Sequence, residues 1–169
     1  MSETKKHLPI WPVFVVLAVI FLLYLLNPVC RYLYTKDFVA RSDAQMAELF
    51  ADNLETAGIT ALDKPMFFIG FSETRTNASC LDLSEGKYNI FSIFAAADAL
   101  DLDTVKASQY IVEHLNDMGY SYTAPTAEDW ANYEAEMSEH IPLWKAFPWY
   151  DSVMETEHCI IVQLTPTEE

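Results

Sequence analysis

The chain has 169 residues, of which 51% are hydrophobic and only four are glycine, a composition that excludes a disordered or low-complexity protein. The net charge of −15 is unevenly placed, because 24 acidic and only six basic side chains lie from Asp37 onward. A segment so acidic repels phosphate backbones, and nucleic acid is therefore excluded as an expected partner.

An N-terminal hydrophobic segment is the first predicted element. Residues 8–30 carry no formal charge, and a helix of this length spans about 35 Å, enough to cross a hydrocarbon core about 30 Å thick. Trp11 and Tyr32 near its ends suit the interfacial aromatic belts. A cleaved signal peptide or lipoprotein signal needs small residues at the cleavage site, and the stretch 27–31 offers none. We therefore expect residues 1–36 to form a cytoplasmic tip and an uncleaved anchor whose partner is the lipid bilayer.

The basic residues around this segment bear on its orientation. Lys5 and Lys6 favour a cytoplasmic N-terminus, whereas three basic residues beyond the segment favour the reverse. Long domains translocate largely regardless of charge. We expect a single-pass protein of the cell membrane with its N-terminus inside and the acidic domain, residues 37–169, outside.

The first half of the domain shows three patterns. A helix is expected from a cap at Ser42-Asp43 to Gly58, because its apolar positions recur at helical spacing. Residues 66–69 form a short continuous apolar run, typical of a buried central strand. Residues 71–87 are polar and irregular, which predicts a long loop.

The next elements are a strand and a helix. Residues 88–94 are predicted to form a second strand. Asp101 or Asp103 is then expected to cap a helix that runs through Met118, with Met118 on its apolar face and Gly119 as the C-terminal stop.

A third helix is predicted to open at Thr126, which stands at capping-box spacing from Asp129. Trp130, Tyr133 and Met137 would form its buried stripe.

Two alternating segments close the chain. Residues 150–154 and 158–164 are predicted to form a hairpin. Helices mixed with strands of both kinds indicate an α+β or α/β layered domain, a small mixed sheet with about three helices, behind one N-terminal transmembrane helix.

Five short motifs occur in order between residues 43 and 164. They are KPMFFIG at 64–70, LNDMGY at 115–120, IPLW at 141–144, DSV at 151–153 and IIVQL at 160–164. Their order resembles the C-terminal extracytoplasmic region of bacterial membrane glucosyltransferases of the phage serotype-conversion type. The chain departs from that pattern at Gln163, where the family usually has lysine, and in the stretch 145–150.

The resemblance implies a setting rather than a reaction. In that family the region follows many transmembrane helices, and catalysis is attributed to acidic residues in an early loop that has no counterpart in this chain. No catalytic residue is carried over. We expect a non-catalytic accessory domain whose partner is a multi-helix membrane glycosyltransferase or a surface polysaccharide. The alternatives are an independent surface-anchored binding module of unknown ligand and an enzyme with its site in residues 71–87.

Aromatic residues and cysteines supply the remaining candidates. An aromatic cluster near a proline-bounded turn comprises Trp144, Phe147, Trp149 and Tyr150. Trp144, Trp149 and Tyr150 could contact a ligand or partner, or the cluster could pack into the core or face the membrane. Cys80 and Cys159 would share one compartment outside the membrane and could form a disulfide, or remain two buried thiols.

Catalytic and metal-binding patterns are not expected. The four histidines have no metal-ligand spacing, so neither a metal nor another cofactor is predicted. Ser72 follows a predicted strand and Gly70, but the G-x-S-x-G pattern of a nucleophile elbow fails at Thr74.

Overall fold

The computed structural model describes residues 11–60, 62–70, 79–83, 86–90, 92–139, 146–147 and 149–164. Its elements are α1 (Trp11–Thr56), β1 (Met66–Ile69), β2 (Ser79–Leu83), β3 (Gly86–Ile90), η2 (Ile93–Ala95), α2 (Ala96–Leu100), α3 (Thr104–Asp117), α4 (Asp129–Glu139), η3 (Tyr150–Ser152), β4 (Val153–Glu155) and β5 (Ile160–Gln163).

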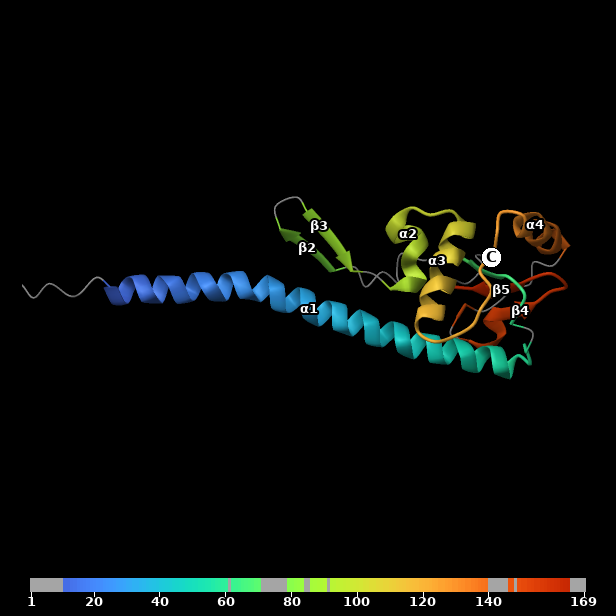
Figure 1. Ribbon diagram of the computed structural model, residues 1–169, viewed down its shortest axis with the longest axis horizontal. Coiled ribbons are helices and arrows are strands. Elements are labelled where there is room, and N and C mark those ends of the chain that lie inside the picture. Colours follow the sequence, from blue (N-terminus) through green and yellow to red (C-terminus); the bar gives the residue numbers. More distant parts are fainter. Residues whose placement is uncertain are drawn as a thin grey trace, which may run out of the picture.

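The helix α1 is by far the longest element, with 46 residues. Its N-terminal part stands clear of the rest of the protein, and its C-terminal part packs against the domain (Figure 1). Within the part of the chain that the structure describes, α1 is the one helix long and apolar enough to cross a membrane. The predicted transmembrane helix is confirmed to this extent. α1 changes direction along its blue part (Figure 1). The helix contains one proline, Pro28, which removes one backbone hydrogen bond, and prolines are a common cause of helix bends.

The predicted helix start at Ser42-Asp43 is wrong. α1 runs without interruption from the hydrophobic segment through both residues. The sequence between Arg31 and Arg41 contains no glycine or proline that would end a helix. The Asp43 carboxylate does not cap α1 either, because it accepts hydrogen bonds from a part of the chain about 50 residues away.

A three-stranded sheet has the order β1-β5-β4. β1 pairs with β5 in parallel, with Phe67 opposite Ile161, and β4 pairs with β5 in antiparallel orientation. The predicted strand at 66–69 is confirmed. The closing hairpin is also confirmed, but its first strand is β4, and residues 150–152, predicted as strand, form the short helix η3 instead. β5, however, is the central strand, whereas β1 lies at an edge of this sheet.

Side chains alternate between the two faces of the sheet. Phe68 and Val162 belong to the main core, with residues of α1 and α3. Phe67 and Ile161 lie on the opposite face, where Trp130 of α4 packs against them. The sheet therefore lies between α1 on one side and α4 on the other.

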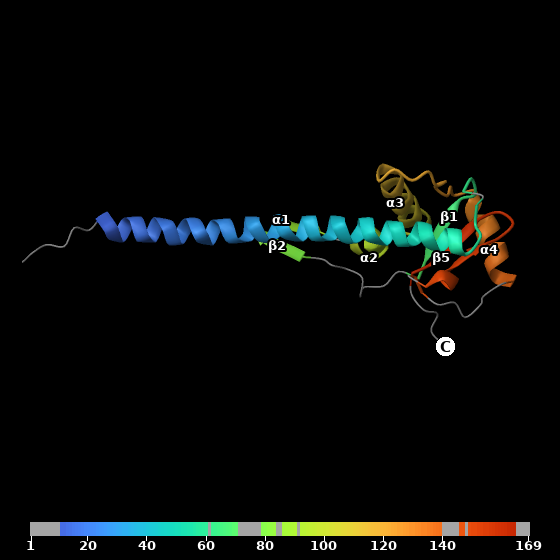
Figure 2. The same cartoon turned by 90° about the horizontal axis from the view of Figure 1, so that it is seen from below.

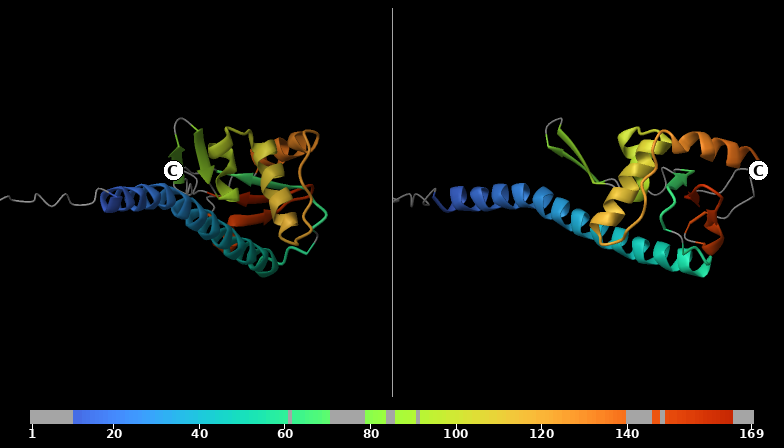
Figure 3. Two further views of the ribbon diagram at one scale, coloured as in Figure 1. Left: turned by 60° about the vertical axis from the view of Figure 1, so that its left-hand side comes forward. Right: turned by 45° about the vertical axis from the view of Figure 1, so that its right-hand side comes forward.

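α3 packs along β1 and contributes to both clusters, with Ile111 in the main core and Val105 on the face covered by α4. Figure 2 shows α1 in front of β1 and β5, and the right-hand view of Figure 3 shows α1 below the sheet and α4 above it. The predicted α+β class is confirmed.

Helix ends follow the predicted local signals. The Asp103 side chain accepts a hydrogen bond from the Lys106 backbone N–H at 2.9 Å and so caps α3. Gly119 follows α3 with a φ of +105°, a left-handed conformation that suits glycine. Met118 was expected on the apolar face, but it is 41% exposed. It is the C-cap residue of α3, where the helix leaves the core.

The second half of the predicted loop 71–87 contains a strand. β2 pairs with β3 in antiparallel register, with Leu81 opposite Tyr88. The strand predicted at 88–94 begins earlier and ends at Ile90, because Ile93 begins the short helix η2.

Candidate functional site

An open groove with a volume of about 630 Å³ is the best candidate for a ligand site in the described part of the chain. It lies between the first turns of α3 and the start of α4. Its lining residues are Asp103, Thr104, Val105, Lys106, Gln109, Ala127 and Trp130.

Both helices that form the groove are fixed at their N-termini. The Thr126 backbone N–H donates to the Asp129 carboxylate at 2.7 Å, and the Asp129 N–H approaches the Thr126 hydroxyl at 3.4 Å, as the predicted capping box requires. Gln109 Nε2 donates to the Pro125 carbonyl at 2.7 Å, which ties α3 to the segment before α4. The groove is therefore held by local hydrogen bonds on both sides.

The aromatic wall of the groove is built into the core. The Trp130 ring stacks on Tyr133 with a centroid separation of 4.7 Å, and it meets the buried Phe67 ring nearly edge-on at 5.9 Å. The predicted buried stripe of α4 is confirmed for Trp130 and Tyr133, which are half-buried. Met137 has no described side chain. A fixed indole beside polar groups suits ligands with both flat apolar and hydroxyl-bearing faces, such as sugars.

The charged residues at the rim form a pair. Lys106 Nζ lies 2.9 Å from the Asp103 carboxylate, and both side chains are more than half exposed. The hydrogen bonds from Lys106, first from its side chain and then from its backbone, lower the pKa of Asp103 below its ordinary value. The rim thus presents one carboxylate and one ammonium group to solvent.

The aromatic residues predicted to bind a ligand do not line this groove as far as the structure describes them. Trp149 is 59% exposed but lies at the start of η3. Tyr150 is described only in its backbone, and Trp144 lies outside the described residues. Trp130 is the aromatic residue that sequence reasoning missed as a groove residue. Its place directly after the Thr126 capping box put it in the first turn of α4.

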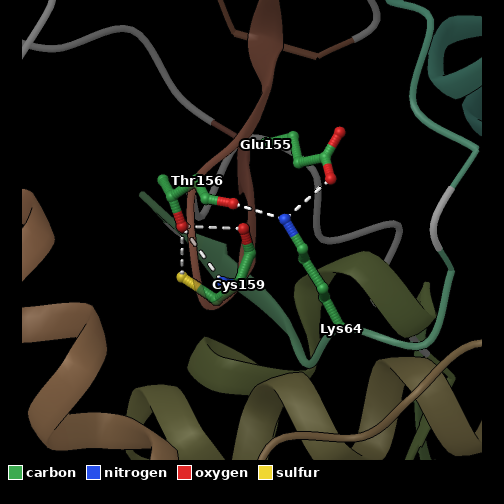
Figure 4. A network of polar contacts seen from close by, with 4 residues as sticks. All are labelled: Lys64, Glu155, Thr156 and Cys159. Carbon is green, nitrogen blue, oxygen red and sulfur yellow. Dashed lines mark hydrogen bonds and ion pairs between the residues drawn. The ribbon is translucent and has the colours of Figure 1, made fainter.

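A second polar cluster closes the β4–β5 hairpin (Figure 4). Lys64 Nζ donates to the Thr156 carbonyl at 2.6 Å and lies 2.8 Å from the Glu155 carboxylate. The Thr156 hydroxyl donates to the Cys159 carbonyl at 2.8 Å, accepts from the Cys159 N–H at 3.0 Å and lies 3.2 Å from its sulfur. These bonds connect the turn of the hairpin to the segment before β1, so their role is structural.

The predicted Cys80–Cys159 disulfide remains a prediction. Cys159 is buried beside Phe67 and Ile161, whereas Cys80 is described only in its backbone, as part of β2.

A buried carboxylate lies where α1 enters the domain. Asp43 is only 4% exposed, and it accepts hydrogen bonds from Ser92 Oγ at 2.6 Å and from the Ile93 N–H at 3.2 Å. Burial raises the pKa of Asp43 above its ordinary value, and the bonds from Ser92 and Ile93 and the charge of His114 only partly oppose this shift. The arrangement clasps α1 to η2.

Histidine and acidic residues do not converge elsewhere in the described ranges. His114 Nδ1 lies 2.8 Å from the Tyr110 carbonyl of the preceding turn, and the two rings are 4.0 Å apart. No group of three His, Cys, Asp or Glu side chains among the described residues could hold a metal ion.

No known protein family, curated protein or solved structure matches this chain. The resemblance to membrane glucosyltransferases therefore stays a prediction.

Proposed function

We propose that this protein is a membrane-anchored, non-catalytic accessory module that positions an acidic α+β domain beside a multi-helix membrane glycosyltransferase or a surface polysaccharide. The observation that carries the proposal is the continuity of α1. The helix that can cross the membrane also supplies Phe50 and Leu54 to the main core. Because the core of the domain includes part of the membrane helix, the domain is held at a fixed position relative to the membrane instead of moving on a flexible linker.

The polar clusters of the domain support a structural role. Asp43, Lys64 and Thr156 are engaged in hydrogen bonds that join elements of the fold. Glycosyl transfer from a lipid carrier needs a membrane-level cavity that binds the carrier phosphate. A single span has no neighbouring helix to shield such polar groups from hydrocarbon. The excess of acidic residues from Asp37 onward also disfavours a phosphate-bearing donor.

The accessory role is tested by reconstitution. We expect the purified full-length chain in lipid to transfer no sugar from a polyprenyl-phosphate-linked donor, and to change the rate of a membrane glycosyltransferase encoded beside it. Turnover by the chain alone would refute the non-catalytic role. An unchanged rate in the partner enzyme would refute the accessory role.

The groove favours one second candidate, an independent carbohydrate-binding module. The fixed Trp130 and the exposed Asp103–Lys106 pair are the observations behind it. In the same reconstitution, retention of surface polysaccharide without the enzyme would favour this candidate. Thr104→Arg, which narrows the groove, should then abolish retention. Glu113→Arg, on the same helix but outside the groove lining, is the matched control.

The proposed orientation places the domain outside the cell, with Lys5 and Lys6 inside. We expect an impermeant maleimide to label Glu113→Cys, an exposed position of α3, in intact cells of a variant lacking Cys30 and Cys80. Carbonate extraction of the same cells should leave the protein in the membrane pellet. Labelling only after lysis would place the domain in the cytoplasm, and release by carbonate would contradict the anchor.

A further inference from the structure

The β2–β3 hairpin is set apart from the rest of the domain. Its two strands pair only with each other, separately from the sheet β1-β5-β4. Among the described elements other than α1, the hairpin reaches farthest toward the N-terminal, membrane end of α1 (Figure 1, Figure 3). Both strands contact α1. A hairpin of two short strands is marginally stable alone in water, and α1 is one surface that supports it.

The hairpin lies beside the light-blue part of α1 (Figure 1, Figure 2), where burial on α1 extends toward the membrane segment. Buried Val39 and half-buried Thr35 and Tyr32 continue the buried stripe of α1 toward the membrane segment. The uncharged segment ends at Cys30. At 1.5 Å per residue, Tyr32 lies about 3 Å and Val39 about 14 Å beyond that point. The headgroup layer occupies about 5–7 Å on each side of the hydrocarbon core. With the hydrocarbon boundary at Cys30, this part of α1 and the hairpin beside it fall at the level of the headgroups and just beyond them.

The residue types of the hairpin suit that level. Directly paired positions of an antiparallel ladder share a face, and neighbouring positions alternate. The pair Leu81 and Tyr88 therefore falls on one face and the pair Asp82 and Lys87 on the other. Tyrosine is enriched at membrane–water interfaces, where one part of its ring is wet and the other apolar.

The exposed side of α1 continues the same chemistry. Leu33 is 58% and Tyr34 72% exposed, although both lie beyond the uncharged segment. Arg31 and Lys36 are also exposed there, in a chain that is otherwise strongly acidic. Basic residues at this position are attracted to anionic headgroups.

We propose that the β2–β3 hairpin and the exposed neck of α1 around Leu33 and Tyr34 rest on the lipid headgroup layer. This surface is continuous with the span, and phospholipid is its proposed occupant. The domain would then be held to the bilayer at two places, through the span and through the hairpin. This inference requires the anchor but does not require any interaction with a glycosyltransferase.

The test measures how close the hairpin lies to lipid. The full-length chain, with Cys30 and Cys80 replaced by serine and the buried Cys159 retained, is reconstituted in phosphatidylcholine vesicles containing one-fifth phosphatidylglycerol. A fluorophore is placed at Asp82→Cys in β2 or at the control position Glu113→Cys in α3. We expect headgroup-nitroxide lipids to quench the Asp82 label at least threefold more than the Glu113 label.

A second variant separates lipid contact from misfolding. Adding Tyr88→Asp should reduce quenching of the Asp82 label to the level of the control, while the thermal unfolding of the domain, followed by tryptophan fluorescence, stays unchanged. Equal quenching of the two labels without that substitution would overturn the proposal. Cross-linking of Asp82→Cys to a second copy or to another protein would also overturn the proposal, because the hairpin would then contact protein instead of lipid.

Discussion

Replacing Phe50 by alanine is expected to lower the free energy of unfolding of the domain by about 3–5 kcal/mol. Phe50 lies on α1, is fully buried, and packs against Phe68, Tyr122 and Phe147 with ring-centroid separations of 5.6, 5.5 and 6.1 Å. Alanine removes three aromatic contacts and leaves a cavity between α1 and the sheet. A loss of this size is a large share of the stability of a typical domain.

Urea unfolding of the full-length chain in detergent, followed by tryptophan fluorescence, measures this loss. Leu49→Ala is the matched control, because Leu49 is the preceding residue of α1 but is 37% exposed. The control should lose much less stability than Phe50→Ala. Equal losses for the two variants would show that α1 is not part of the domain core.

The second large effect is expected at the carboxylate clasp of α1. Ser92→Ala removes the 2.6 Å hydrogen bond to Asp43 and leaves a buried carboxylate with one weaker donor, the Ile93 N–H. Loss of a hydrogen bond to a buried charged group should cost about 2–3 kcal/mol at neutral pH. Ser42→Ala, at a half-buried position of α1 next to Asp43, is the control and should change stability little.

The pH dependence of that cost identifies its cause. Because burial raises the pKa of Asp43 in the folded state, the folded protein holds this proton more tightly than the unfolded chain. Protonation of Asp43 therefore contributes most to the stability of the folded state below the ordinary pKa of 3.8, and this contribution is lost as pH rises through the raised pKa. Without Ser92 this pKa should rise further. The stability difference between the original protein and Ser92→Ala should grow with pH between about 4 and neutrality, and a constant difference would argue against the clasp.

The elements that were predictable from the sequence are those whose caps, stops or apolar runs lie within a few consecutive residues. The Asp103 cap and Gly119 bound α3, and the Thr126–Asp129 pair opens α4, because each acts on backbone groups of its own turn. The apolar run at 66–69 identified a strand for the same reason.

The features that the sequence did not reveal depend on distant partners. Ser42-Asp43 looked like a helix cap, but Ser92, the partner of Asp43, lies 49 residues away. No local pattern records that distance. The edge position of β1 likewise depends on β5, which lies about 90 residues later in the chain and takes the centre of the sheet.

The candidate groove was hidden for a similar reason. The groove forms only where the first turn of α3 packs beside the start of α4, and the hydrogen bond from Gln109 to the Pro125 carbonyl joins these two segments. The aromatic composition around 144–150 pointed to Trp149 instead, because a count of aromatic rings does not show which ring borders a groove.

Because α1 is continuous, it also fixes how the domain is rotated about the helix axis relative to the membrane span. The 46 residues of α1 are about 69 Å long, and each residue added to a helix turns the remainder of the chain by about 100° and advances it by about 1.5 Å. When the membrane-spanning part of α1 rotates about the helix axis, the domain therefore rotates with it. The number of residues between Arg31 and Phe38 therefore determines the direction, in the plane of the membrane, in which the groove between α3 and α4 faces.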